Sequence, residues 1–111
     1  MFAPNGTFLV PTPAQTVVIK NATMADFYVV LPTLALSGTV THARETPAGD
    51  LSVAFDSVTA AYRCASRGVF EINGRRCPVI GFNDAGEPFR SGNVAAALAA
   101  DDWLTRVRTT L

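Results

Sequence analysis

One histidine and two cysteines are the side chains of this sequence that could carry chemistry together: His42, Cys64 and Cys77. A histidine titrates near neutral pH and can act as a general base. A cysteine becomes a nucleophile where cations favour its thiolate, and Arg63 and Arg76 directly precede the two cysteines. If all three side chains converged in one pocket, the chain would be a small ligand-binding or enzymatic domain.

The sequence around these residues gives that hypothesis little support. No nucleophile or orienting group can be named for His42, and the chain lacks the G-x-S-x-G, glycine-rich phosphate-loop and C-x-x-C motifs. Three ligands without paired spacing are not typical of a zinc site. We therefore predict no catalytic residue, no metal site and no cofactor. The two cysteines are interpreted as small buried side chains, with a disulfide between them as the alternative.

Two acidic pairs are weaker candidates for chemistry. Asp84 and Glu87 lie in a loop with a glycine between them, where they could bind a cation or share a proton. We interpret them as part of a hydrated turn, and Asp101 and Asp102 as a solvated helix face.

Composition excludes several function classes. The chain has 111 residues, which suits one domain, and 49% of them are hydrophobic. Only 16% are charged, against roughly 25% in average soluble domains. Its net charge of zero argues against a nucleic-acid partner, because phosphate binding requires excess positive charge. A chain this apolar is expected to bury surface against a partner or against copies of itself, and a homo-oligomer is the expected state.

No membrane partner is expected either. The longest apolar run, residues 27–36, is too short to span a bilayer and contains Pro32. The first residues lack the basic start of a secretory signal and are interrupted by prolines. The expected localisation is therefore a virion or the cytoplasm.

Short strands are the elements expected to position these residues. Residues 7–10 and 15–20 are β-leaning but flanked by prolines, which confine strands to sheet edges, so residues 1–14 are predicted to form an extended arm. Residues 26–31 resemble a strand buried on both faces, and residues 34–42 a strand buried on one. Gly38 in the latter marks a bulge or a close approach.

Residues 51–68 allow two interpretations. As a helix, they carry an apolar stripe at a period of 3.6, with Asp50 as N-cap and Gly68 beyond the end; its members are Leu51, Ala54, Phe55, Val58, Ala61, Tyr62 and Ala65. As strands, they alternate at first, but the alternation breaks before Val58. The β-rich surroundings place the strand interpretation slightly ahead.

The clearest local signal is Asn73-Gly74, which predicts a hairpin with a type I′ turn within residues 68–82. That turn places Ile72 opposite Arg75, Glu71 opposite Arg76, and Phe70 opposite Cys77. Glu71 and Arg76 would then form an ion pair. Arg75 would remain free near the tip.

A C-terminal helix is predicted at residues 91–108. It is alanine-rich, begins at small polar residues and ends with arginines that suit the helix dipole. Its apolar face comprises Val94, Leu98, Leu104, Val107 and Leu111. Trp103 is expected to anchor this helix to the sheet.

The predicted fold is therefore β-rich α+β: a small antiparallel sheet or partly open barrel in residues 15–111, with an N-terminal arm and one C-terminal helix. The predicted function is that of a non-enzymatic structural protein that packs against copies of itself or neighbouring subunits, such as a small phage virion component. The alternative is a protein-binding module, or a ligand-binding or enzymatic domain using His42 and the cysteines. The expected contact residues are Phe2, Phe8, Leu9, Val10, Arg75 and Arg76.

Overall fold

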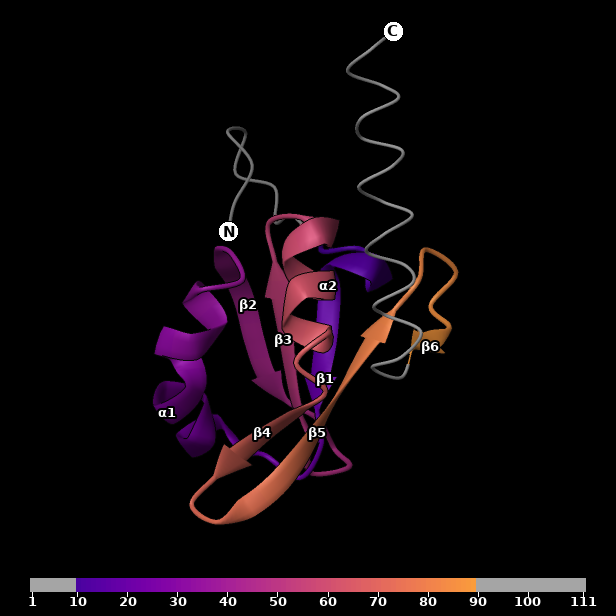
Figure 1. Ribbon diagram of the computed structural model, residues 1–111. Coiled ribbons are helices and arrows are strands. Elements are labelled where there is room, and N and C mark those ends of the chain that lie inside the picture. The colour runs from indigo at the N-terminus through magenta and orange to yellow at the C-terminus, as the bar shows by residue number, and fades with distance from the viewer. Residues whose placement is uncertain (1–9, 90–111) are drawn as a thin grey trace, which may run out of the picture.

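The computed structural model describes residues 10–89 (Figure 1). The elements in chain order are the 3₁₀ turn η1 (Pro13–Gln15), β1 (Thr16–Ile19), α1 (Met24–Ala35), β2 (Val40–Glu45), β3 (Leu51–Phe55), α2 (Val58–Ala65), β4 (Val69–Ile72), β5 (Arg75–Phe82) and β6 (Pro88–Phe89).

The strands form one antiparallel sheet in the order β2-β3-β1-β5-β4, and the two-residue β6 also pairs with β5. The central strand is β1, which pairs with both β3 and β5. Helix α1 connects β1 to β2, and α2 connects β3 to the β4–β5 hairpin. Strand β1 lies between β3 and β5, and each crossover contains a helix. This strand order is the split βαβ (ferredoxin-like) arrangement.

Both helices pack on one face of this sheet. Alternate strand residues such as Val17, Ile19 and Val53 are fully buried and share one core with Val30 and Leu34 of α1 and with residues of α2. The intervening residues, among them Thr16, Val18 and Ser52, are only half-buried and point to the other face. Within residues 10–89 no helix covers that second face, which we call the open face.

Residues 26–31 are helical, so the prediction of a strand there is wrong. Thr23 is the N-cap of α1: its hydroxyl accepts from the Asp26 backbone N–H, and the Asp26 carboxylate accepts from the backbone N–H of Thr23. Asp26, Val30 and Leu34 lie four residues apart and form the buried stripe. The sequence looks strand-like because apolar residues occur on both sides of this helix.

The strand predicted at residues 34–42 begins only at Val40, because α1 continues to Ala35. Gly38 marks the close approach that its position indicated: a Cβ atom there would overlap the Cβ of Ala60 in α2. Residues 51–68 contain both alternatives in succession, since β3 ends at Phe55 and α2 begins at Val58. The N-cap of α2 is Ser57, whose hydroxyl accepts from the Ala60 N–H, and not Asp50.

The hairpin prediction is confirmed. Asn73 and Gly74 both have positive φ, 50° and 79°, as a type I′ turn requires. The pairs Ile72–Arg75, Glu71–Arg76 and Phe70–Cys77 are opposite one another in the β4–β5 ladder. The hairpin extends beyond the sheet toward the N-terminal end of α1 (Figure 1).

The predicted fold class is therefore wrong in its helices and in its arm. The chain has a small α+β fold with an antiparallel sheet. The sequence predicted one C-terminal helix, whereas the structure has two helices, α1 and α2, that lie between strands. Pro13–Gln15 form η1, which packs against α2, and Ala14 is fully buried, so this part of residues 1–14 is not a free arm. Strand β1 is central and not at an edge. The helix predicted at residues 91–108, with Trp103, lies outside the described residues.

Candidate functional site

Both cysteines are buried free thiols on the helix-covered side of the sheet. Cys64 has no exposed surface, and burial raises the pKa of its thiol to about 12, although the charge of Arg67 acts in the opposite direction. A thiol with so high a pKa stays protonated at neutral pH and is a poor nucleophile. The prediction of two small buried side chains is confirmed, and the alternative of a disulfide is wrong.

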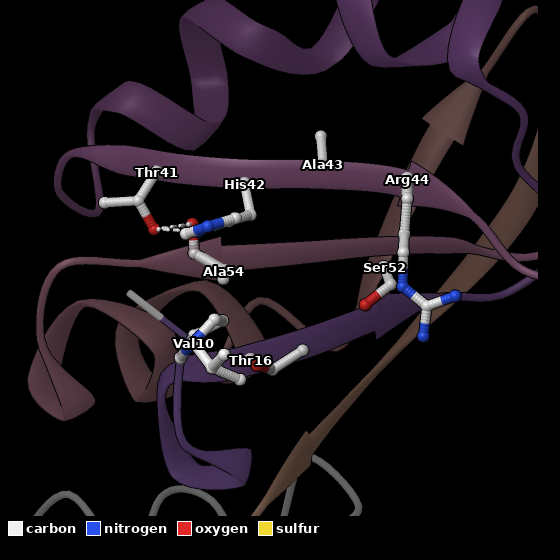
Figure 2. A pocket seen from close by; sticks show the side chains of 9 residues that line it. Val10, Thr16, Thr41, His42, Ala43, Arg44, Ser52 and Ala54 are labelled. Carbon is white, nitrogen blue, oxygen red and sulfur yellow. Dashed lines mark hydrogen bonds between the residues drawn. The ribbon is translucent and has the colours of Figure 1, made fainter. Parts of the chain in front are cut away.

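His42 lies on the opposite face of the sheet from the cysteines. It follows the bulge in β2, is opposite Ala54 of β3, and points to the open face, whereas its neighbour Ala43 points away (Figure 2). The hypothesis that His42, Cys64 and Cys77 share a pocket is therefore wrong. Within residues 10–89, no group of three His, Cys, Asp or Glu side chains could hold a metal ion.

A pocket of about 560 Å³ lies on the open face where β2, β3 and β1 run side by side (Figure 2). We call it the sheet groove. One arginine, one histidine and three hydroxyl side chains line it, and none of its lining residues is acidic; the full set is Val10, Pro11, Thr16, Thr41, His42, Ala43, Arg44, Ser52 and Ala54. Its polar groups therefore favour an anionic ligand.

Hydrogen bonds fix the histidine at the wall of this groove. The Thr41 hydroxyl donates to the carbonyl oxygen of Ala54 at 3.4 Å, and Nδ1 of His42 lies 2.9 Å from the same hydroxyl oxygen. Thr41 thus connects the imidazole ring of His42 to the carbonyl oxygen of Ala54. This chain of bonds orients the imidazole ring along the sheet surface.

Arg44 is the exposed cation of the groove. It is opposite Ser52 in the β2–β3 ladder, and both side chains point to the open face (Figure 2). The ion pairs within residues 10–89 are Lys20–Asp50 and Arg75–Asp26, so no carboxylate in that range neutralises Arg44. Its guanidinium is available to a ligand.

A second pocket, of about 380 Å³, adjoins the first and shares Val10, Pro11, Thr41 and His42 with it. Its lining adds Asp56, which is exposed. The combined depression therefore has a cation at one end and a carboxylate at the other.

The centre of the open face carries no aromatic side chain. Four-stranded sheets that bind single-stranded RNA stack the bases on aromatic rings of their exposed face. Here β1 places Val18 and β3 places Ser52 at the centre, opposite one another in the ladder. Val18 and Ser52 therefore offer no ring on which a base could stack at this position.

The second unusual surface is the solvent side of α1. Tyr28 is 70% exposed, Val29 58% and Leu36, at the C-cap, 76%. Pro32 lies between them and is also exposed. Because these residues follow a helical spacing, they share one side of the helix, which we call the outer face of α1.

Charge is absent from the outer face of α1. The one charged residue between Met24 and Ala35 is Asp26, and it is buried. Helices at a protein surface ordinarily carry charged and polar residues on the solvent side. An exposed helix face made of Tyr, Val, Pro and Leu is typical of an interaction surface.

The tip of the hairpin binds to the beginning of α1. Arg75 donates from Nη2 to Oδ2 of Asp26 at 2.8 Å and from Nη1 to the carbonyl oxygen of Asn21 at 2.7 Å. The hydrogen bond from Arg75, with that from the Thr23 backbone, lowers the pKa of Asp26 against the opposing effect of burial. The prediction that Arg75 is free is therefore wrong.

The other predicted contact residues have varied positions. Arg76 is exposed and opposite Glu71, but within residues 10–89 the ion pair of the hairpin is Arg75–Asp26 and not Glu71–Arg76. Val10 is 83% exposed and lines the sheet groove. Phe2, Phe8 and Leu9 lie outside the described residues. Asp84 and Glu87 are exposed in the turn between β5 and β6, where the Asn83 side-chain amide donates to the Glu87 carboxylate at 3.0 Å.

No known protein family, curated protein or solved structure matches this chain. Within the described residues, no helix is long and apolar enough to cross a membrane.

The sequence interpretation missed the outer face of α1 and Arg44. The signal for the helix was present, because Thr23 and Asp26 have the spacing of a capping box. The sequence from 27 to 36 also contains no charge, which is unusual for a helix in a small domain. Arg44 carried no local signal, because its position in the groove depends on the pairing of β2 with β3.

Proposed function

We propose that this chain is a non-enzymatic assembly protein that associates with copies of itself through the outer face of α1. The observation that carries the proposal is the exposure of Tyr28, Val29 and Leu36 on a helix side without charge. Exposed apolar area of this kind is removed from water when a second protein covers it.

A second copy is the occupant that the chemistry of this surface favours. The outer face has no charge and so does not require a partner of opposite charge. An apolar patch is complementary to itself across a twofold axis, where residue i of one copy meets residue j of the other. The low charge content of the whole chain, 16%, agrees with a protein that is partly covered in its assembled state.

The size of the surface sets the expected affinity. Four exposed side chains on three helical turns give an interface at the low end of the range for stable complexes, which begins at roughly 1,200 Å² of total buried area. We therefore expect a reversible dimer with a dissociation constant in the micromolar range. The proposal of a virion subunit, and that of contacts from Phe2, Phe8 and Leu9, stay predictions.

The experiment is sedimentation equilibrium of the full chain over a range of concentrations, comparing wild type with Val29→Lys. Lysine at position 29 places a charge in the interface of each copy, so the dissociation constant should rise by at least tenfold. A dimer that forms equally well in this variant would overturn the proposal.

Two further variants make the comparison specific. Val10→Lys makes the same substitution at another exposed valine, in the segment that the sequence predicted as a contact, and should leave the dimer intact. Ala48→Lys adds the same charge in the exposed β2–β3 turn and controls for net charge. If Val10→Lys and not Val29→Lys dissociates the dimer, the contact lies in the N-terminal segment instead.

A further inference from the structure

The sheet groove is a second surface with chemistry of its own, and it shares no residue with the outer face of α1. Its lining includes Arg44 and contains no acidic residue. No carboxylate within residues 10–89 forms an ion pair with Arg44. Guanidinium groups bind phosphate and carboxylate through two parallel N–H donors. The positive end of the groove therefore suits an anionic oxygen-rich group.

One hydroxyl group lies beside the position that such an anion would take. Ser52 is directly opposite Arg44, and in antiparallel ladders such partners have Cβ atoms about 5 Å apart. The Thr16 hydroxyl, on the other side of β3, already donates to the Thr12 carbonyl oxygen at 3.1 Å. Arg44 and the Ser52 hydroxyl can donate to different oxygens of one group, and a phosphate offers more acceptor oxygens than a carboxylate does.

The dimensions indicate a small molecule and not a long strand of nucleic acid. The volume of about 560 Å³ lies within the range of small-ligand pockets. Val10, Pro11 and Ala54 add an apolar wall against which the remainder of a ligand could pack. A polynucleotide would require more cations than a chain with a net charge of zero provides. Sheets that bind single-stranded RNA also carry aromatic rings on their central strands, where this chain has Val18 and Ser52.

We infer that the sheet groove binds a small phosphorylated molecule, with its phosphate held by Arg44 and Ser52. His42, held by Thr41, forms the wall beside the phosphate and limits its position. The exposed Asp56 at the far end of the adjoining pocket disfavours a second anionic group there. The preferred ligand therefore carries its negative charge at one end.

The test is an NMR titration of the ¹⁵N-labelled full chain with adenosine 5′-monophosphate, with adenosine alone as the matched ligand without phosphate. The monophosphate should shift the amides of residues 42–44 and 52, and adenosine should not. Arg44→Gln should weaken binding by about tenfold, the loss of one charge-assisted contact at an exposed site. Arg63→Gln, which removes an exposed arginine of α2, should leave the affinity unchanged.

Each contrary result has a definite meaning. Equal shifts with adenosine, equal weakening by Arg44→Gln and Arg63→Gln, or no shift with the monophosphate would overturn the phosphate site. A third arm uses a ten-nucleotide oligo(dT). Binding much tighter than that of the monophosphate, lost in Arg44→Gln and steeply dependent on salt, would overturn the assignment to a small molecule in favour of a nucleic-acid strand.

Discussion

The outer face of α1 and the sheet groove are two exposed regions of one small domain, and their chemistry is opposite. The helix face exposes Tyr28, Val29 and Leu36 without any charge. The groove combines Arg44 with hydroxyl groups and lacks carboxylates. The first surface suits another apolar surface, and the second suits a small anion.

The difference follows from how each region meets the core. The strands alternate, so Val17 and Val53 are buried while Thr16 and Ser52 emerge as polar residues on the open face. Helix α1 does not alternate in this way: one side buries Val30 and Leu34, and the other side is apolar too. A second apolar side contributes nothing to the core of residues 10–89, and this is the observation that supports the proposed contact between copies.

The largest expected effect concerns a residue on which both regions depend. Gly38 connects α1 to β2 and lies against Ala60 of α2, where a Cβ atom has no room. Gly38→Ala should lower the free energy of unfolding by about 2 kcal/mol, the usual effect of overpacking. Chemical denaturation measures this change. The exposed neighbour provides the control, since Thr39→Ala should change stability by less than about 0.5 kcal/mol; equal stabilities of the two variants would contradict the close approach.

The second prediction concerns α1 and not the sheet groove, because the substitution removes contacts at the beginning of that helix. Asp26→Asn removes the charge that accepts hydrogen bonds from Arg75 and Thr23 at the beginning of the helix. The expected loss at neutral pH is about 1–2 kcal/mol, typical of a charged bond together with a cap. Because the pKa of Asp26 is lowered in the fold, this stabilisation is complete above the ordinary Asp value of about 3.9 and disappears as the pH falls through the lowered pKa.

Unfolding curves of wild type and Asp26→Asn at several pH values check this sign. The two proteins should differ most at neutral pH and converge in acid. A difference that grows toward low pH would mean that Asp26 is not stabilised as a carboxylate.

The sequence could predict the hairpin because its determinants are local. Asn73 and Gly74 adopt positive φ almost regardless of what surrounds them, and the turn then sets the register of both strands. The same register could not show where Arg75 points, because Asp26 is distant in the sequence and close only in the fold. The ion pair was therefore missed although the turn was correct.

The two helices were missed or left open for different reasons. In residues 26–31 the apolar residues of the buried side and the outer face run together, which hides the helical period behind a strand-like composition. In residues 51–68 the broken alternation marks the change from β3 to α2 after Phe55, and each alternative described half of the segment. The groove could not be predicted, since Thr16, Arg44 and Ser52 come from three strands brought together by pairing.

The smallest expected effect is independence of the two regions. Arg44 lies on the open face, and Val29 lies on the far side of the helix layer. Arg44→Gln should therefore leave dimer formation unchanged, and Val29→Lys should leave ligand binding unchanged. Sedimentation of Arg44→Gln should give the dissociation constant of wild type, and Val29→Lys should bind the monophosphate with unchanged affinity. Loss of both functions in either variant would show that the two regions are coupled and do not act separately.

The most direct test of the proposed assembly is whether α1 of one copy meets α1 of another. Val29→Cys introduces an exposed thiol into a chain whose two other cysteines, Cys64 and Cys77, are buried. Mild oxidation should then produce a disulfide-linked dimer, because position 29 lies near the centre of the outer face and approaches its own symmetry mate. The account predicts efficient cross-linking of Val29→Cys and little of Ala48→Cys in the exposed β2–β3 turn. Equal cross-linking of the two variants, or none in Val29→Cys, would contradict it.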